Sequence, residues 1–418
     1  MSNFIQDFMT YHSGTECHKS YLRWSAMAAL GACAGPRYRL LNGSYYIYPI
    51  MYIILVGPQG NRKSYAMDAA KNLIDQAFPD YPIAADITSR DDIVRLLSLD
   101  ITERSYVDQN NDPQIYHPLA FYISEFKDFT SYNPAMMINF LVNVYDKVGK
   151  LFKCSTIKRG VEDSQSPFVS ILACENTDWF LRRLKEGVVT GGFSRRFIVC
   201  YEYGKPDEAR PQIILPPDHV EIKSRMVRHL QKLHTVAKNF AWHPKGFAAF
   251  TTWYIKNFNE REDDSSIAGF KSTKDQQLLK VCMLLNLAEE NPTYLITEEL
   301  IEEGLVWLAL VEPNLKKLYL SGGRNELQAE WVKVIDVINS RGGIMAEKEF
   351  LRHAGKDLSP QELYHSVKHL CDSDQLVKQA FPYPPGGPVK TWLLTGEGMK
   401  QPAIAKAMRE FMSQKLAS

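Results

Sequence analysis

Between about residue 50 and residue 203, short continuous apolar runs alternate with segments of helical periodicity. The apolar runs have the length of buried strands and cover residues 52–56, 119–123, 168–174 and 197–201. The helical segments between them include residues 65–76, 133–148 and 176–185. Buried strands that alternate with helices are typical of an α/β sandwich around a mainly parallel sheet. We therefore predict an α/β core over residues 37–206.

The segments on either side of this core follow other patterns. Residues 1–36 show rough helical spacing and end at a Gly-Pro pair, which predicts an N-terminal helical segment. Residues 218–320 look helical throughout and predict a lid-like helical domain. Residues 325–398 have the order helix, helix, helix, strand, turn, strand, which is that of a winged helix-turn-helix. A C-terminal helix or tail over 399–418 completes the predicted organisation.

Composition narrows the possible environments. The chain has 418 residues and a formal net charge of +1. It therefore lacks the large positive net charge that would indicate nucleic-acid binding. Its seven cysteines lack metal-ligand spacing and indicate buried thiols in a reducing compartment. The longest apolar run, residues 45–56, is interrupted by Pro49 and is too short to span a bilayer. With no basic signal-peptide start, the chain is expected to be soluble and intracellular, with no membrane partner.

A glycine-rich loop follows the first strand of the core and precedes a helix. Its spacing is that of G-x-x-x-x-G-K-[ST], whose backbone N–H groups hold phosphates while Lys reaches the terminal ones and Ser holds Mg²⁺. One position departs from the pattern, because Arg62 stands where the second Gly belongs. We therefore predict that ATP and Mg²⁺ bind here, with Ser64 as the metal ligand. The predicted nucleotide-binding residues are Gly57, Pro58, Gln59, Gly60, Asn61, Arg62, Lys63, Ser64 and Tyr65.

An acid is expected at the end of a neighbouring strand. The apolar run 119–123 ends in Ser124-Glu125, where Asp-Glu is usual. Ser124 can hold a metal-bound water but brings no charge, so Glu125 becomes the candidate general base that polarises the attacking water. The alternative is an ordinary surface carboxylate at a strand end.

Two further groups could complete a hydrolysis site. Asn176 and Thr177 follow the strand 168–174 and could touch the terminal phosphate or the water, although either could instead cap the next helix. Arg195 and Arg196 precede the strand 197–201 and could act as an arginine finger in a neighbouring subunit, with Arg196 favoured. The alternative for this pair is a solvated basic turn.

Candidate DNA contacts come from two places. Lys158 and Arg159 lie at the tip of an expected hairpin and could line the pore of a ring, or could form an ordinary exposed turn. In the predicted winged helix the candidates are Lys368, Lys378 and Lys390. Acids match the bases one for one between residues 342 and 395, so a protein-docking surface is equally compatible.

Residues 2–203 resemble a family of phage and prophage P-loop ATPases that are often described as primase-helicase-like, of the AAA+/RecA-like kind. The resemblance rests on the Arg-Trp motif in 21–26, the loop with its Arg-Lys-Ser ending, the segments 145–146 and 156–160, and the segments 177–180 and 192–197. The family implies a role in DNA replication, often as a ring-forming ATPase. It makes Arg62 a family variant, while Ser124 departs from the Asp that relatives commonly carry.

These patterns together predict a DNA-dependent, ATP-hydrolysing ring motor, such as a replicative helicase of a phage or mobile element. Its expected partners are single-stranded or forked DNA, further copies of itself in a hexamer, and a primase or other replication protein. The expected location is the cytoplasm of a bacterial host. The alternatives are a non-motor loader or switch that recruits a replication partner through the winged helix, and a purely structural nucleotide binder.

Overall fold

In the computed structural model the chain forms two compact units, residues 1–317 and 318–418. The structure describes residues 3–85, 88–99, 101–130, 133–156, 160–185, 192–204, 212–259, 267–321, 334–354, 360–372, 375–384 and 387–416. The first unit holds the predicted α/β core with a mainly parallel sheet, as the sequence pattern indicates.

The main sheet has the strand order β4-β5-β8-β3-β9. Its strands are β3 (Tyr52–Val56), β4 (Arg104–Val107), β5 (Pro113–Ile123), β8 (Pro167–Glu175) and β9 (Phe197–Tyr201). All neighbours pair in parallel except β4, which runs antiparallel to the start of β5. Ile83 also pairs in parallel with Ala120 through a single bridge. Every residue of β3 and β8 is buried, which explains their continuous apolar sequence.

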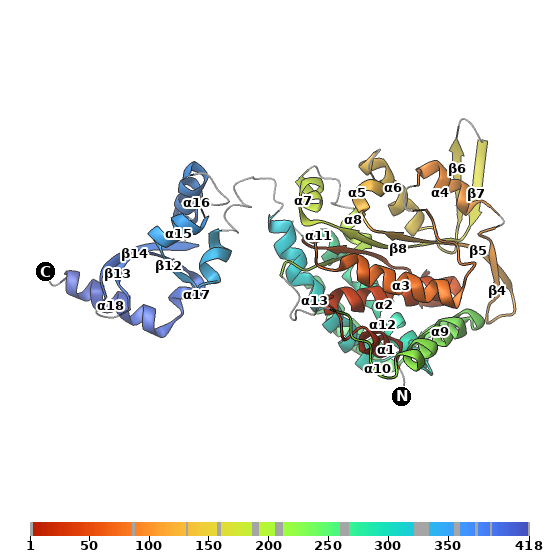
Figure 1. Cartoon of the computed structure of the whole chain (residues 1–418). Coiled ribbons are helices and arrows are strands. Elements are labelled where there is room, and N and C mark those ends of the chain that lie inside the picture. The colour runs from red at the N-terminus through yellow and green to blue at the C-terminus, as the bar shows by residue number, and fades with distance from the viewer. Residues whose placement is uncertain are drawn as a thin grey trace. The chain divides into compact units, whose positions relative to one another are not determined.

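Helices cover both faces of this sheet (Figure 1). On one side lie α1 (Phe4–Tyr11), α2 (Lys19–Ala34) and α3 (Lys63–Ala77). On the other lie α4 (Arg90–Leu97), α5 (Phe126–Phe129) and α6 (Pro134–Tyr145). Ser89 caps α4 through its side chain, and Asn133 caps α6 in the same way. Short helices α7 (Thr177–Lys185) and α8 (Gly192–Arg196) follow β8 and precede β9.

A second sheet, of order β11-β10-β1-β2, corrects the expectation that the region after residue 218 is wholly helical. Its strands are β1 (Tyr38–Asn42), β2 (Tyr45–Ile47), β10 (Lys238–Trp242) and β11 (Leu295–Ile296). The helix that begins at His219 ends at Thr235, and residues 238–240 pair in parallel with 38–40. The hairpin between β1 and β2 turns at Gly43-Ser44, because Asn42 still pairs with Tyr45.

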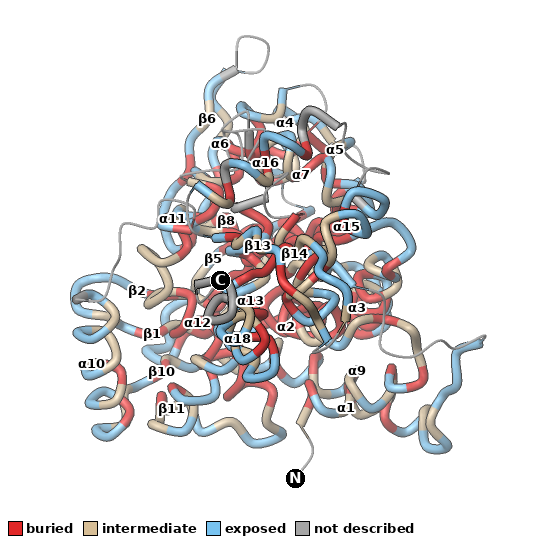
Figure 2. The backbone as a smooth tube through the Cα atoms, turned by 90° about the vertical axis from the view of Figure 1, so that its left-hand side faces the viewer, coloured by how far each residue is buried: buried red, intermediate tan, exposed pale blue. Residues whose placement is uncertain are grey.

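Helices fill the rest of the region after residue 218. They are α9 (His219–Thr235), α10 (Pro244–Asn259), α11 (Ala268–Ser272), α12 (Lys274–Ala288) and α13 (Glu298–Ser321). Residues 218–317 belong to the same compact unit as the main sheet. Figure 2 shows that the buried residues of the chain concentrate in the strands of the sheets and in α2 and α12. The core therefore continues from the main sheet into this helical region.

An antiparallel hairpin made of β6 (Leu151–Thr156) and β7 (Gly160–Gln165) projects from the first unit (Figure 1). It agrees with the hairpin arm expected from the sequence. The tip that carries Lys158 and Arg159 lies outside the described residues.

The second unit packs helices against a small antiparallel sheet of order β12-β14-β13. Its elements are a helical stretch over 334–339, β12 (Ile344–Ala346), α15 (Glu347–Ala354), α16 (Pro360–Asp372), β13 (Leu376–Pro382), β14 (Val389–Thr395), α17 (Gly396–Met399) and α18 (Pro402–Leu416). Val334, Phe350 and Leu370 share one buried cluster, so this unit has a core of its own. Within the described ranges, no helix combines the length and apolar character needed to cross a bilayer.

Candidate nucleotide-binding site

The glycine-rich loop leaves the carboxyl end of β3 and enters α3 at Lys63. β3 lies inside the sheet, between β8 and β9, so the loop has a strand end on each side. Val56, the last residue of β3, pairs with Glu175 of β8 and with Tyr201 of β9. Ligands of open α/β sheets bind outside the carboxyl ends of the strands, and the N-terminus of a helix favours anions. The loop therefore occupies the edge where an anionic ligand is expected.

Close packing under the loop requires Gly57. The Tyr21 hydroxyl is buried and donates a hydrogen bond of 2.8 Å to the carbonyl oxygen of Val56. A Cβ atom at position 57 would collide with this hydroxyl and would lie 2.6 Å from the carbonyl oxygen of Glu202. Tyr21 is fully buried and has little room to move aside. The first loop position therefore has no room for a side chain.

Arg62 adopts a left-handed backbone conformation, which glycine reaches without steric cost. Its φ is 57°, in the left-handed region, which costs a residue with a Cβ about 1 kcal/mol. Its guanidinium lies 2.8 Å from a carboxylate oxygen of Glu16, so the side chain is held by the N-terminal segment. The thiol of Cys17 also donates to the carbonyl oxygen of Arg62, at 3.5 Å. Segment 12–17 thus fixes the last turn of the loop.

The remaining loop residues are held in place by a small set of hydrogen bonds. The amine of Lys63 donates to the carbonyl oxygens of Gly57 and Pro58, each at 2.7 Å, and burial lowers its pKa. Asn61 is buried and donates to the carbonyl oxygen of Gly204 at 3.0 Å. The Tyr65 hydroxyl lies 2.8 Å from Nδ1 of His12. Ser64, in the first turn of α3, is exposed.

Two glutamates end the strands on this side of the loop. Glu125 follows β5, has a side chain that is 51% exposed, and forms an ion pair with Lys127. Glu175 ends β8 and is only 2% exposed. Its two carboxylate oxygens accept the backbone N–H groups of Lys127 at 2.6 Å and of Asn176 at 2.7 Å. Burial raises the pKa of Glu175 to about 7. Glu175 thereby joins the end of β8 to the turn that carries Glu125.

Glu175 was missed as a site residue by the sequence analysis, which passed over it in favour of its neighbours. The available signal was its position as the last residue of an otherwise apolar strand. Asn176 serves as a helix cap, because its side-chain oxygen accepts the N–H of Trp179 at 2.8 Å. The hydroxyl of Thr177 is buried and has no hydrogen-bond partner among the described residues. A phosphate role for Asn176 stays a prediction.

A pocket of about 670 Å³ opens beside the loop. Pro58 and Gln59 form one side of it, and the first turn of α7 forms another. Lys127 and Arg182 bring positive charge to its wall. Its aromatic lining residues are Trp179, Tyr201 and Tyr203. The pocket thus joins the loop, the turn after β5 and the end of β8 in one continuous space.

Arg195 and Arg196 lie at the other edge of the sheet. They precede β9, whose first residue, Phe197, pairs with Tyr52 at the start of β3. The loop follows the opposite end of β3, so these arginines do not meet the loop of their own chain. Arg195 is exposed, and Arg196 forms an ion pair with Asp146. A role in a neighbouring subunit stays a prediction.

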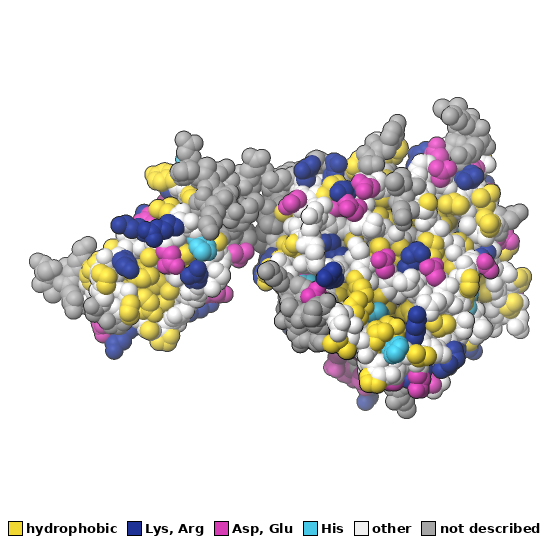
Figure 3. Space-filling model, in the orientation of Figure 1, with side chains coloured by type: hydrophobic (Ala, Val, Ile, Leu, Met, Phe, Trp, Pro, Cys, Tyr) yellow, Lys and Arg dark blue, Asp and Glu magenta, His cyan; other side chains and the backbone are white. Residues whose placement is uncertain are grey.

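The candidate DNA contacts in the second unit are surface lysines. Lys368 lies on α16 and is exposed. Lys378, on β13, has its amine 2.5 Å from a carboxylate oxygen of Glu347. Lys390, on β14, lies with its amine 6.0 Å from the ring centre of Trp392. Figure 3 shows basic and acidic side chains interspersed over the visible faces, in keeping with the net charge of +1.

A resident metal site built from protein side chains is not indicated within the described ranges, where no cluster of three or more His, Cys, Asp or Glu residues is placed to hold an ion. Neither a scan against protein-family models nor a search of curated proteins found a match to this chain.

Proposed function

We propose that the chain is a Mg²⁺-dependent ATPase that binds the phosphates of ATP at the loop 57–64. The observation that carries this proposal is the position of the loop, between the carboxyl end of the interior strand β3 and the N-terminus of α3, beside Glu125 and Glu175. A helix N-terminus, a conformationally constrained loop and a lysine at its end supply the donors and positive charge that a triphosphate needs.

Lys63 is the residue that we expect to change partners when ATP binds. Its amine contacts the carbonyl oxygens of Gly57 and Pro58, each at 2.7 Å. A phosphate group offers a charged acceptor in place of two neutral ones, so the amine turns toward it. The exposed hydroxyl of Ser64 fits Mg²⁺, which prefers oxygen ligands. When bound, Mg²⁺ neutralises charge on the phosphates.

Glu125 is the better candidate for accepting the proton of the attacking water. Its carboxylate is half exposed and lies at the end of β5, whereas both oxygens of Glu175 already accept backbone N–H groups. We assign Glu175 a positioning role, because it ties the turn 125–127 to the strand next to the loop. Glu125 must leave its ion pair with Lys127 to orient a water toward the γ-phosphate.

The proposal extends to a motor, in which several subunits form a ring that moves along DNA. Its support is the resemblance of residues 2–203 to phage P-loop ATPases, together with the position of Arg196 at the edge away from its own loop. In a ring, Arg196 of one subunit would reach the γ-phosphate held by the next, after exchanging Asp146 for that phosphate. A replicative helicase of a phage or mobile element is the corresponding biological role.

One observation favours the loader or switch as a second candidate. In the unit that resembles a winged helix, Lys378 is held by Glu347 at 2.5 Å, and Arg341 lies 3.1 Å from Glu349. Basic side chains that are already paired with acids have less charge to offer a phosphate backbone. Such a surface suits a protein partner, and this candidate predicts ATP turnover that DNA does not stimulate.

The experiment compares ATP hydrolysis by the wild type and by Glu125→Gln, with and without single-stranded DNA. Removing a general base lowers turnover by about 100-fold or more. Asp128→Asn is the matched control, because it removes an exposed acid three residues away on α5. The motor requires that DNA increases wild-type turnover and that an ATP analogue produces a hexamer in a particle-mass measurement.

Different results separate the candidates. Turnover that depends on Glu125 but not on DNA supports the loader or switch and excludes the motor. A monomer under all conditions excludes the shared arginine finger. If Lys63→Ala and Glu125→Gln both retain wild-type turnover, the assignment of this loop as the hydrolysis site is wrong.

A further inference from the structure

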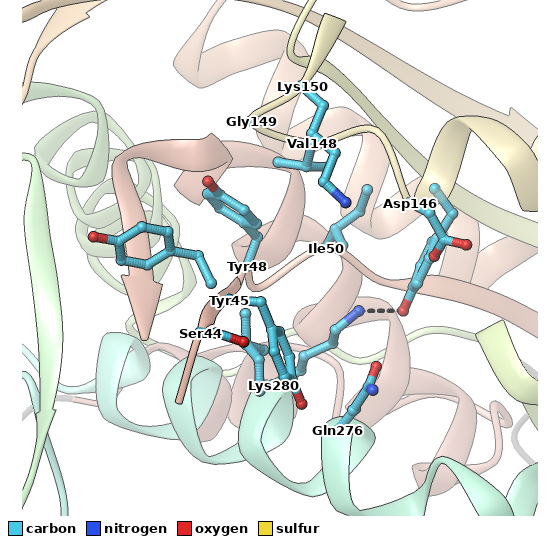
Figure 4. A pocket seen from close by; sticks show the side chains of 13 residues that line it. Ser44, Tyr45, Tyr48, Ile50, Asp146, Val148, Gly149, Lys150, Gln276 and Lys280 are labelled. Atoms are coloured by element: carbon cyan, nitrogen blue, oxygen red, sulfur yellow. Dashed lines mark hydrogen bonds between the residues drawn. The ribbon is translucent and has the colours of Figure 1, made fainter. Parts of the chain in front are cut away.

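A second pocket, of about 520 Å³, lies in the first unit and is separate from the phosphate loop. Three elements enclose it: the turn and second strand of the β1–β2 hairpin, the segment 145–150 that leads into β6, and α12. None of its lining residues belongs to the loop 57–64 or to the pocket beside it. Figure 4 shows the labelled side chains of these three elements around a common space.

Tyrosines of the β1–β2 hairpin form the aromatic wall of this pocket. Tyr45 and Tyr46 are 46% and 40% exposed. The guanidinium of Arg39 lies 4.3 Å from the ring centre of Tyr46 and occupies one of its faces. Tyr48 is packed against the backbone at Gly149, where a Cβ atom would collide with its hydroxyl. Tyr45 is therefore the ring with the most free surface at the pocket.

Two amines face the same space from opposite walls. In Figure 4 the side chains of Lys150 and Lys280 extend toward one another across the pocket. Lys150 is exposed, while Lys280 is only 5% exposed. The amine of Lys280 donates to the hydroxyl of Tyr145 and lies 4.0 Å from the centre of that ring. The nearest acid of the lining, Asp146, already forms an ion pair with Arg196. Lys150 thus brings a positive charge to the pocket. Burial lowers the pKa of Lys280 to about 7, and an anionic phosphate bound beside this amine would favour its protonated form.

An exposed aromatic ring beside two amines suits one kind of ligand, a planar base joined to a phosphate. The volume lies within the usual range for small-molecule sites, about 300–1,000 Å³. Lys150 directly precedes β6, so the pocket lies at the base of the β6–β7 hairpin. Proteins that bind single-stranded nucleic acids without sequence preference stack the bases on aromatic side chains and hold the backbone in a positively charged groove.

We propose that this pocket binds one nucleotide unit of single-stranded DNA, with its base stacked on Tyr45 and its phosphate held by Lys150 and Lys280. The inference rests on the proposed function, since it supplies the DNA contact that a DNA-dependent ATPase needs. A free mononucleotide offers the same base and phosphate and is the other source of this chemistry. The position of the pocket, away from the phosphate loop, leaves ATP and the strand free to bind together.

The test measures the binding of a fluorescent oligodeoxythymidine of about 15 nucleotides by anisotropy. Tyr45→Ala should weaken binding about tenfold, and Tyr45→Phe should restore it, because stacking needs the ring and not the hydroxyl. Lys150→Ala should weaken binding and reduce the slope of log affinity against log salt by about 0.7, the value for one phosphate contact on a single strand. The matched controls are Phe258→Ala, an exposed aromatic on α10, and Lys71→Ala, a surface lysine on α3.

The free mononucleotide is tested by competition with dTMP. If dTMP displaces the oligonucleotide at an equal concentration of nucleotide units, a free nucleotide is the ligand and the assignment to a strand is overturned. If Tyr45→Ala and Lys150→Ala bind the oligonucleotide as the wild type does, the pocket does not bind the strand. Weakened binding in both variants, with wild-type binding in both controls, supports the proposal.

Hydrolysis assays separate this inference from the proposed function. The pocket variants should keep the ATP turnover measured without DNA and lose its stimulation by DNA. If the wild type binds the strand through this pocket but hydrolyses no ATP, the pocket stands and the ATPase proposal fails. If ATP is hydrolysed but the pocket variants are stimulated by DNA as strongly as the wild type, the ATPase proposal stands and the pocket assignment fails.

Discussion

The carboxylate of Glu175 accepts the backbone N–H of Lys127 at 2.6 Å. This one contact joins the end of β8 to the turn that follows β5, two strands that are neighbours in the sheet. Its second oxygen accepts the N–H of Asn176, where α7 begins. The buried carboxylate of Glu175 thus holds the turn after β5 and the start of α7 together through two hydrogen bonds, and it can still be protonated.

The titration of Glu175 predicts a specific pH dependence of stability. Burial raises its pKa from 4.5 to about 7, so between these pH values the folded protein holds a proton that the unfolded chain has released. Stability contributed by this site therefore falls as the pH rises toward 7 and is constant above it. The free energy of unfolding of the wild type, relative to Glu175→Gln, should fall by about 3 kcal/mol from about pH 4.5 to about pH 8.

Chemical denaturation at a series of pH values measures this difference. Asp128→Asn serves as the control for loss of a negative charge in the same region. If the free energies of unfolding of the wild type and Glu175→Gln change with pH in the same way, the prediction is wrong. The two N–H groups would then cancel the effect of burial on the pKa of Glu175.

Gly57→Ala tests the close packing under the loop. The added methyl group would collide with the Tyr21 hydroxyl and approach the Glu202 carbonyl, so we expect a loss of about 1–3 kcal/mol in stability and a loss of ATP affinity. Gly204→Ala is the matched control, because its Cβ would meet no heavy atom within 4 Å. Thermal unfolding and nucleotide-binding assays give the two readouts. Equal stability of both variants would contradict the packing.

Arg62→Gly and Arg62→Ala differ only by a Cβ atom at a left-handed position. Both variants lose the contact with Glu16, so that loss cancels in the comparison. Because φ is 57° at this residue, the glycine variant should be more stable than the alanine variant by about 1 kcal/mol. Urea denaturation of the two variants measures this difference in stability. If the alanine variant is as stable as the glycine variant, the loop has relaxed away from the left-handed conformation.

Lys280→Met tests the buried amine at the second pocket. Burial lowers the pKa of Lys280 from 10.5 to about 7, so above pH 7 the unfolded chain binds a proton that the folded protein lacks. Wild-type stability should therefore rise with pH relative to the methionine variant, by about 3 kcal/mol between about pH 7 and about pH 9.5. Denaturation curves at both pH values decide it. If the difference in free energy of unfolding between the wild type and Lys280→Met does not change with pH, water or an acid keeps the Lys280 amine charged in the folded protein.

Local patterns were enough to predict the strand, loop and helix over residues 52–77, because each depends on its own residues. The run of apolar residues makes the buried strand, and the glycine-rich stretch makes the turn. Local chemistry decides these features before any distant contact forms.

Features that depend on distant partners were not predictable in this way. Residues 238–242 form a strand because β1, two hundred positions earlier in the chain, offers a parallel edge. The importance of Glu175 lies in its contact with the backbone of Lys127, which follows a different strand of the sheet. The contacts of His12 and Glu16 with the loop also join segments whose sequences say nothing about each other.

The position of β3 has a consequence for the order in which the protein forms during synthesis. β3 is made early, yet both of its neighbours, β8 at 167–175 and β9 at 197–201, are made much later. Until residue 175 has left the ribosome, β3 has neither neighbour, and until residue 201 has left it, β3 still exposes the unpaired apolar edge that β9 covers. Such long-range parallel pairing is slow and exposes the chain to aggregation. Chaperone binding to nascent chains should therefore end only after β9 emerges.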